Sequence, residues 1–457
     1  MEKSVAFCTL GCKVNQYETD AMREMFVSCG YDVKEFSEPA SVYVINTCTV
    51  TNMADRKSRQ MLHRARKKNP GSIIVAVGCY VQAAGEQLET DEMIDIVIGN
   101  NMKNQVVRVV EEYMENTCRS ENKREAHIPD IAHEQNYEAM SITTVSEHTR
   151  AYIKIQDGCN QFCSYCIIPY ARGRVRSRKM NEILDEVRGL TANGYKEIVL
   201  TGIHISSYGL DFEHGASKEA EEDYGPFRNS ALIDLIEALS AVEGVERIRL
   251  GSLEPRIITV DFVERLCRIP QICPHFHLSL QSGCDATLKR MNRHYTTDLY
   301  MEKCQLLREY FDRPALTTDV IAGFPGETED EFAETEKFLS EVHFADMHIF
   351  KYSRRHGTKA AVMPGQVDPQ IQTKRSDRLI GLAETMRDDY LELCYDQEQQ
   401  VLIEEETEIN GVRYMTGHSK NYIRCAFEPE GLSPNMVILG HINSKLNQDF
   451  VFCKRID

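Results

Sequence analysis

The sequence of 457 residues predicts an α/β multidomain protein with an N-terminal parallel α/β sheet domain, a central partial (β/α)6 barrel and a C-terminal small, OB-like β-barrel. Two separate alternations of apolar strands with amphipathic helices predict the first two parts. A closing run of short strands predicts the third. We expect the N-terminal domain at 2–115, a linker at 116–145, the barrel at 146–375, and a connecting helix with the β-barrel at 376–457.

The N-terminal domain begins with strands separated by helical segments. The expected strands are residues 4–10, 41–46, 72–78 and 94–98. Between the first two, Ala21, Met22, Met25 and Phe26 recur at helical spacing on one apolar face. Alternating β and α elements predict a parallel sheet covered on both faces. The segment that follows is polar and irregular, which is typical of a linker.

The second alternation contains six β/α units. Its expected strands are residues 151–156, 197–202, 247–252, 276–280, 316–322 and 346–352. Six units favour an incomplete barrel over the closed barrel of eight. Residues 211–228 interrupt the pattern with a charged insertion, which we expect to be a mobile surface loop.

A long helix, expected at 371–397, precedes the tail. The tail has five short expected strands at 401–405, 412–416, 422–427, 436–442 and 450–454. Five short strands in so few residues predict a small barrel of OB type, a fold that often binds nucleic acid. A structural cap on the central barrel is the alternative.

Composition limits the class of protein. The absence of a long apolar run or a signal peptide predicts a cytoplasmic location, where most of the 16 cysteines should be reduced. A net charge of −17 argues against a generic nucleic-acid binder. However, residues 56–68 and 172–179 are strongly basic and contain no acid. Each stretch is either an RNA contact or a solvated surface.

Cys159, Cys163 and Cys166 form a C-x-x-x-C-x-x-C motif after the first barrel strand. Three close thiolates can hold three corners of a [4Fe-4S] cluster and leave the fourth iron open to a ligand. Zinc is the main rival, but zinc usually takes a fourth protein ligand in a small ribbon or knuckle. The end of a barrel strand is where a β/α barrel places its active site. The position therefore favours the cluster.

A second set of cysteines is dispersed along the chain. Cys12, Cys48 and Cys79 each come just after one of the first three expected strands. In a parallel sheet these strand ends share one edge, where ligands bind. The three thiols can therefore hold a second cluster or be small buried core residues. The other ten cysteines are interpreted as core or incidental, and His204, His277 and His348 as core or barrel-lining residues.

The motifs around the six cysteines resemble those of the radical S-adenosylmethionine (SAM) methylthiotransferase family. The matching segments are 9–16, 46–50 and 78–80 around the dispersed cysteines, 156–178 around the close set, and 278–283 and 319–328 in later barrel strands. The tail is similar in position to a TRAM domain, a small β-barrel that engages the substrate. The resemblance runs from about residue 3 to the end of the chain.

The resemblance implies an enzyme with two [4Fe-4S] clusters and SAM as cofactors. Cys159, Cys163 and Cys166 would hold the SAM-binding cluster, where reductive cleavage gives a 5′-deoxyadenosyl radical. Cys12, Cys48 and Cys79 would hold the auxiliary cluster that presents sulfur, and a second SAM would supply the methyl group. Residues 11–18 most resemble the branch that methylthiolates C2 of N6-threonylcarbamoyladenosine at position 37 of tRNA.

The resemblance also implies further site residues. For SAM these are Tyr165, Gly202, Ser252 and Glu254, although the usual Gly-Gly-Glu motif is absent and residues 201–204 stand in its place. For the anticodon loop of tRNA they are Arg172, Arg174, Arg176 and Arg178. An electron donor and a sulfur source would be further partners.

Two kinds of alternative remain open at this point. Within the family, the substrate could be N6-isopentenyladenosine in tRNA or a ribosomal protein. In a different class, the chain could be a noncatalytic iron–sulfur RNA-binding protein or redox sensor. Formation of 5′-deoxyadenosine would separate the second kind from an enzyme.

Overall fold

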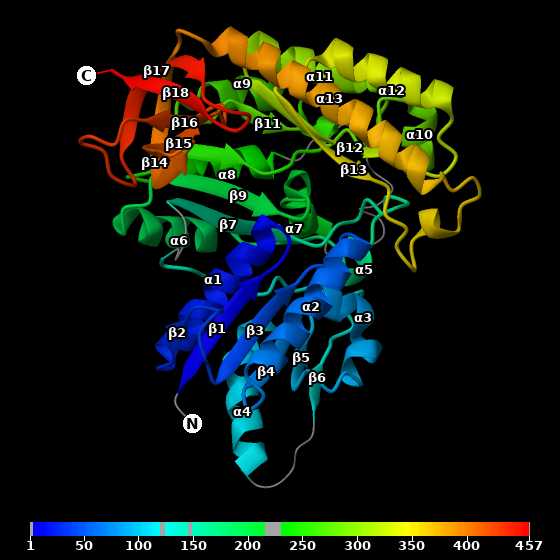
Figure 1. The fold of residues 1–457 in the computed structure, drawn as a ribbon, viewed down its shortest axis with the longest axis vertical. Helices are drawn as coiled ribbons and strands as arrows, with labels where there is room; N and C mark the ends of the chain where they lie inside the picture. The colour runs from blue at the N-terminus through cyan, green and yellow to red at the C-terminus, as the bar shows by residue number, and fades with distance from the viewer. Residues whose placement is uncertain (1–2, 119–123, 145–148, 215–229, 457) are drawn as a thin grey trace.

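The computed structural model describes residues 3–118, 124–144, 149–214 and 230–456. Three parts follow one another along the chain (Figure 1): an N-terminal α/β domain, a central barrel beside it, and a C-terminal β-barrel at the opposite end of the central barrel. The predicted fold class is confirmed. Most of the predicted 211–228 insertion lies outside the described residues. In the part of the chain that the structure describes, no helix is long and apolar enough to cross a membrane.

The N-terminal sheet has six strands, and all of its pairs are parallel. In spatial order the strands are β2 (Asp32–Lys34), β1 (Ser4–Thr9), β3 (Val42–Thr47), β4 (Ile73–Gly78), β5 (Ile96–Ile98) and β6 (Glu125–His127). Side chains of α1 (Lys13–Ser28) and α4 (Val106–Cys118) pack on one face, and those of α2 (Asn52–Lys68) and α3 (Cys79–Glu89) on the other. Two-sided cover explains why the central strands are buried throughout.

Two strands of this sheet were not predicted. β2 and β6 are three residues long and lie at the sheet edges, where side chains are more polar. β6 falls inside the segment predicted as a linker. Its pairing with β5 is a long-range contact, and so short a polar strand has no periodicity that would reveal it in the sequence.

The central barrel is an incomplete one of six parallel strands. They are β7 (Arg150–Asp157), β9 (Glu197–Gly202), β10 (Arg247–Leu250), β11 (His275–His277), β12 (Ala315–Ala322) and β13 (Asp346–Lys351). Bridges from Ile248 to Ile272 and from Leu253 to Leu278 join β10 to the β11 segment, so the two sheets form one curved layer. A two-residue strand, β8 (Arg176–Ser177), pairs antiparallel with the free edge of β7.

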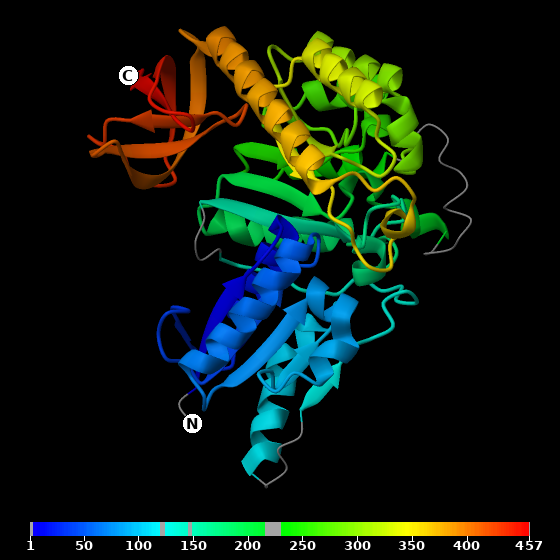
Figure 2. The same ribbon diagram turned by 45° about the vertical axis from the view of Figure 1, so that its right-hand side comes forward.

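Helices lie between the barrel strands in sequence. They are α5 (Ile168–Arg172), α6 (Met180–Ala192), α7 (Leu210–His214), α8 (Ala231–Ser240), α9 (Val260–Cys267), α10 (Asp285–Arg290), α11 (Thr297–Tyr310) and α12 (Glu329–Val342). The long helix α13 (Pro369–Cys394) packs against α12, β12 and β13 and leads to the C-terminal barrel (Figure 2).

The C-terminal part is a closed five-stranded barrel in the order β14-β15-β16-β18-β17. Its strands are β14 (Glu398–Ile409), β15 (Val412–Ser419), β16 (Arg424–Phe427), β17 (Val437–Lys445) and β18 (Val451–Arg455). Arginines at the start of β10 hold it in place, since Arg247 donates to the carbonyl oxygens of His418 and Ser419, both at 3.0 Å. The C-terminal barrel therefore covers the end of the central barrel where the strands begin.

Candidate active site

The three dispersed cysteines lie at one edge of the N-terminal sheet. β1, β3 and β4 are parallel neighbours, and Cys12, Cys48 and Cys79 follow their ends. Gly11 has φ +104°, and a Cβ there would come within 3.0 Å of Cys48 Sγ. No side chain fits at residue 11, so the loop that carries Cys12 can pack directly onto Cys48.

A single guanidinium connects this edge to the central barrel. Arg172, at the end of α5, donates its Nε–H to Cys79 Sγ over 3.0 Å. The same group donates to Asn15 Oδ1 at 2.7 Å, and Asn15 Oδ1 lies 3.9 Å from Cys12 Sγ. Since α5 follows Cys166 by only a few residues, Arg172 joins the two sets of cysteines that the sequence keeps apart.

The network around Arg172 is buried and carries excess positive charge. Arg172 pairs with Glu18 at 2.8 Å and Asp157 at 3.1 Å. The other cations on these two carboxylates are Lys103, Lys154 and Arg176. Four cations outnumber the carboxylates even when the nearby Glu138 is included. Burial opposes the charge of Arg172, but Cys79, Glu18 and Asp157 hold its pKa well above the ordinary value.

This charge fits an anionic group at the cysteines. A cluster held by three thiolates carries negative charge, and buried cations beside it offset the cost of removing it from water. Thiols, rather than carboxylates or imidazoles, are the donors that iron–sulfur clusters use. Cys12, Cys48 and Cys79 therefore have both the donor chemistry and the electrostatic surroundings for an iron–sulfur cluster.

The second set lies in the loop after β7. Gly158 has φ +71°, and a Cβ there would meet the Arg174 carbonyl oxygen at 1.8 Å, so this position requires glycine. Within the loop, the Gln161 N–H donates to Cys159 Sγ over 3.5 Å. From outside it, Arg293 donates to Cys163 Sγ over 3.3 Å. The backbone and a half-buried cation thus both face sulfur atoms of this set.

Burial raises the pKa of Cys166 to about 12 and that of Cys159 above its ordinary range. In the dispersed set, burial raises the pKa of Cys48 to about 11. As free groups these thiols stay protonated near neutral pH. They would become thiolates only when a metal replaces the proton, which couples cluster binding to proton release.

The predicted SAM residues differ in their surroundings. The Tyr165 ring packs edge-on against Phe324, with ring centroids 6.4 Å apart. Gly202 ends β9, and a Cβ there would come within 3.0 Å of Gln156. Their contact with SAM stays a prediction.

Ser252 and Glu254 differ in their exposure and in their hydrogen-bond partners. Ser252 is exposed and lines a cavity. Glu254 is buried, and its carboxylate accepts the Nε–H of Arg256 at 2.6 Å. Glu254 therefore has a protein partner already, and the role of both residues toward SAM stays a prediction.

His204, which belongs to the segment that replaces the Gly-Gly-Glu motif, and Gln161 are two further polar groups of the barrel. His204 Nδ1 is 2.6 Å from Ser207 Oγ, while its buried Nε2 has no hydrogen-bond partner among the described residues. Burial and the nearby Arg293 and Arg256 lower the pKa of His204 to about 3, so the ring is neutral. The Gln161 Nε2 in the cysteine loop likewise has no partner in the described structure. Two unsatisfied buried polar atoms suit a polar ligand such as SAM.

Arg293 is a further site residue that sequence reasoning missed. It is separated from the cysteine loop by more than a hundred residues and lies in no recognised motif. Besides Cys163 it contacts the Tyr295 hydroxyl and the Ser279 carbonyl, at 2.8 Å and 3.1 Å. Only folding brings it to the cysteines.

Three of the four arginines predicted to contact RNA are buried, so that prediction is wrong for Arg172, Arg176 and Arg178. Their exposed fractions are 0%, 0% and 4%. Arg172 and Arg176 face Asp157, and Arg178 pairs with Glu186. The sequence shows the basic stretch but not that the fold buries it against Asp157, Glu186 and the distant Glu18.

Arg174 is the partly exposed member of that stretch, with its guanidinium 4.5 Å from the Phe162 ring centroid. Its contact with RNA stays a prediction. The other basic stretch is different, because it forms most of α2. Six of its basic side chains are exposed there: Arg56, Lys57, Arg59, Arg64, Lys67 and Lys68.

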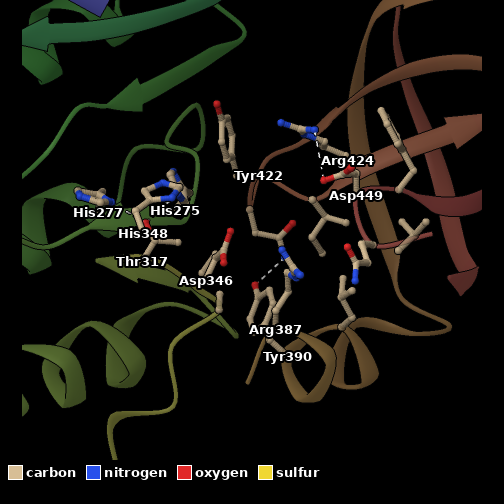
Figure 3. A pocket seen from close by; sticks show the side chains of 18 of the residues that line it. His275, His277, Thr317, Asp346, His348, Arg387, Tyr390, Tyr422, Arg424 and Asp449 are labelled. Atoms are coloured by element: carbon tan, nitrogen blue, oxygen red, sulfur yellow. Dashed lines mark hydrogen bonds and ion pairs between the residues drawn. The ribbon is translucent and has the colours of Figure 1, made fainter. Parts of the chain in front are cut away.

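A cavity of about 470 Å³ lies between the central barrel and the C-terminal barrel. Figure 3 shows His277, Thr317 and His348 on one side and Arg424 and Asp449 on the other. His277, Asp319 and His348 come from adjacent strands, and their ligand atoms lie within 4.8 Å of one another. His277 also faces Thr317 Oγ1 at 3.0 Å. As the sequence predicted, these histidines line the barrel.

Comparison with known proteins agrees with this site. Residues 153–339 match the radical SAM superfamily, and residues 4–99 match the model described as uncharacterized protein family UPF0004. The structure is similar to that of the radical SAM methyltransferase TsrM of Kitasatospora setae. The TM-score is 0.56 at 14% identity, over 79% of this chain and 77% of that one, which supports the fold alone.

Three curated relatives cover nearly the whole chain. Threonylcarbamoyladenosine tRNA methylthiotransferase MtaB of Bacillus subtilis is 40% identical over 93% of this chain and 90% of its own. The Aquifex aeolicus protein of the same name is 36% identical over 92% and 97%. A tRNA-2-methylthio-N(6)-dimethylallyladenosine synthase of Methylacidiphilum infernorum is 32% identical over 92% and 88%.

The barrel and its three-cysteine loop thus define a radical SAM protein. Within that class, similarity along almost the entire chain shows that it belongs to the tRNA methylthiotransferase family.

Proposed function

We propose that this enzyme methylthiolates C2 of N6-threonylcarbamoyladenosine at position 37 of tRNA, giving 2-methylthio-N6-threonylcarbamoyladenosine. The observation that carries the proposal is the contact of Arg172, which follows Cys166 by six residues in the chain, with Cys79 of the dispersed set. The names of the two most similar curated relatives described above support this substrate.

The six cysteines have distinct proposed roles. Cys159, Cys163 and Cys166 hold the SAM-binding cluster, and Cys12, Cys48 and Cys79 hold the auxiliary cluster. When bound, these clusters and SAM supply the one-electron chemistry and the methyl group that no side chain offers for an unactivated C–H bond.

The chain's own residues position these groups. Arg172 donates a hydrogen bond to Cys79 at the auxiliary site, and Arg293 keeps a positive charge at Cys163. The neutral His204 and the amide of Gln161 offer hydrogen bonds to SAM, as do Gly202, Ser252 and Glu254 at neighbouring strand ends. Tyr165 packs on its adenine. The reductant and the sulfur source come from other molecules, and the enzyme acts in the cytoplasm.

We further propose that α2 is the surface that binds the tRNA backbone. Its N-terminus adjoins the site, since Asn52 donates to the Arg354 carbonyl after β13 at 3.1 Å. Lys57 and Arg64 are exposed and lie seven residues apart, on one helix face. Phosphate binding by exposed cations needs no sequence readout.

Reversing both charges, as Lys57→Glu with Arg64→Glu, should weaken tRNA binding about tenfold at low salt. It should also make the slope of log K against log salt shallower by about two, because binding with two fewer phosphate contacts releases about two fewer counterions. Filter binding across a salt series measures both. The control is Arg188→Glu with Lys337→Glu, an equal charge change on exposed residues of α6 and α12. Equal weakening in the two double variants would contradict a specific role for α2.

Nucleoside mass spectrometry of tRNA tests the proposed substrate. In a strain that lacks the gene, 2-methylthio-N6-threonylcarbamoyladenosine should disappear while N6-threonylcarbamoyladenosine accumulates, and the gene should restore the product. Persistence of the product at the wild-type level would contradict the proposal. Loss of 2-methylthio-N6-isopentenyladenosine instead would assign the enzyme to the other tRNA substrate.

A further inference from the structure

Lys13 brings a positive charge from the auxiliary cysteine site into the cavity between the two barrels. It directly follows Cys12 and lines that cavity together with Ser252 and Tyr422. Its side chain is half-buried. One short stretch of chain therefore presents a cluster ligand to one side and an ammonium group to the cavity.

Three cationic side chains lie close to the Tyr422 ring. The Arg249 guanidinium lies 4.7 Å from the ring centroid, that of Arg150 lies 5.5 Å away, and Lys13 Nζ lies 5.9 Å away. His275 stacks on the ring with centroids 4.6 Å apart. Both side chains are labelled at the cavity in Figure 3. Tyr422 has φ +71°, a strained conformation that surrounding contacts must maintain.

The carboxylates of this region are already paired with arginines. Glu197 lies 2.7 Å from both Arg247 and Arg249, and Glu404 lies 3.1 Å from Arg150. Three arginines thus share two carboxylates. The acids elsewhere in the cavity are Asp319, Asp346 and Asp449, of which Asp319 faces His277 and Asp449 faces Arg424.

In the part of the chain that the structure describes, Lys13 forms no ion pair. Burial and the neighbouring arginines lower its pKa, although Tyr422 and Glu197 oppose that effect. His275 and His418 add no charge, because burial lowers the pKa of both. Lys13 and the three arginines therefore exceed their two carboxylates, Glu197 and Glu404, by two positive charges beside Tyr422. A partly buried excess of this kind calls for an anionic ligand.

We infer that Lys13 binds the carboxylate of the N6-threonylcarbamoyl group and so selects this base over one with an uncharged N6 substituent. This inference rests on the proposed function. C2 and C6 of adenine flank the same ring nitrogen, so a base with C2 at the Cys12 site places its N6 substituent beside residue 13. Adjacent Cα atoms are about 3.8 Å apart, within reach of a lysine side chain.

The positive charge of Lys13 would favour a base with an acidic N6 substituent and also disfavour a base with an uncharged one. A carboxylate neutralises Lys13, whereas an isopentenyl group would cover the ammonium without a partner and leave it unsolvated. Loss of one partner from a largely desolvated charge pair typically weakens binding by about 30-fold or more. The backbone phosphates of RNA are the other anions at hand, and the experiment must separate them from the carboxylate.

The test uses the reconstituted enzyme and two anticodon stem-loops. One carries N6-threonylcarbamoyladenosine, and the other carries the same nucleoside with its threonyl carboxylate as a methyl ester. Fluorescence anisotropy gives the Kd of each, and methylthio product formation gives kcat/KM. The wild type should prefer the acid by about 30-fold in Kd. Lys13→Met should reduce the ratio to about one, while Lys13→Arg, which keeps the charge, should retain most of it.

Two results would overturn the inference. If the wild type binds acid and ester equally, no cation recognises the carboxylate, whatever the variant does. If Lys13→Met weakens both ligands to the same degree, the lysine binds a phosphate common to both. In either case a wild type that still methylthiolates the acid leaves the proposed function standing. A wild type that forms no methylthio product from the acid contradicts the proposed function itself.

Discussion

Replacing Cys79 with alanine should abolish methylthio transfer while SAM cleavage continues. Cys79 belongs to the dispersed set at the N-terminal sheet, and the cysteines of the barrel loop would keep their own cluster. Reduced Cys79→Ala enzyme should therefore still form 5′-deoxyadenosine but no 2-methylthio nucleoside. Cys163→Ala should lose both products, because it removes a ligand of the SAM-binding cluster. Liquid chromatography with mass spectrometry quantifies the two products in one assay.

Cys267→Ala is the matched control. Cys267 is exposed on α9 and belongs to neither set, so this variant should keep both products. If Cys79→Ala made methylthio product at the wild-type rate, the dispersed set would have no catalytic role. If Cys163→Ala still cleaved SAM, the close set would not hold the cluster that SAM needs.

Arg172→Met should have the largest effect on stability outside the cysteines. The substitution leaves Glu18 and Asp157 buried with one fewer cation, and Cys79 loses its donor. Lys103, Lys154 and Arg176 still face the two carboxylates, so the cost comes from the lost hydrogen bonds, each of which contributes about 1.5–3 kcal/mol to the free energy of unfolding when a charged group takes part. Arg172→Lys should recover little of this, since an ammonium cannot reproduce the planar set of donors that contacts Glu18, Asp157, Asn15 and Cys79. Urea denaturation measures the difference.

Arg188→Met is the corresponding control, because Arg188 is an exposed arginine with a surface ion pair to Asp185. Its loss should change the free energy of unfolding by no more than about 1 kcal/mol. A similar small change in Arg172→Met would mean that the buried network does not hold the two domains together.

The elements best predicted from the sequence are those with strong periodicity. β9 begins and ends at the predicted residues, and the predicted helix at 371–397 is α13, displaced by two or three residues at its ends. The convergence of Cys12, Cys48 and Cys79 was also predictable, because parallel strands end at one edge. These results need only local pattern and topology.

What the sequence could not reveal depends on contacts between distant residues. A run of arginines in a sequence suggests exposed side chains. Nothing near Arg172 in the sequence indicates that it will be buried in an ion pair with Glu18. Tyr422 and Arg249 are far apart in the chain, so the cation cluster around Lys13 exists only in the folded protein. Charge along a sequence therefore identifies cations without showing which of them face solvent.

Iron and sulfide content tests the central claim of two clusters most directly. After anaerobic reconstitution, the wild type should contain about eight irons and eight sulfides per chain, since each [4Fe-4S] cluster holds four of each. Cys79→Ala and Cys163→Ala should each retain about four irons. About four irons or fewer in the fully reconstituted wild type would contradict the second cluster and, with it, the proposed division of roles between the two sets of cysteines.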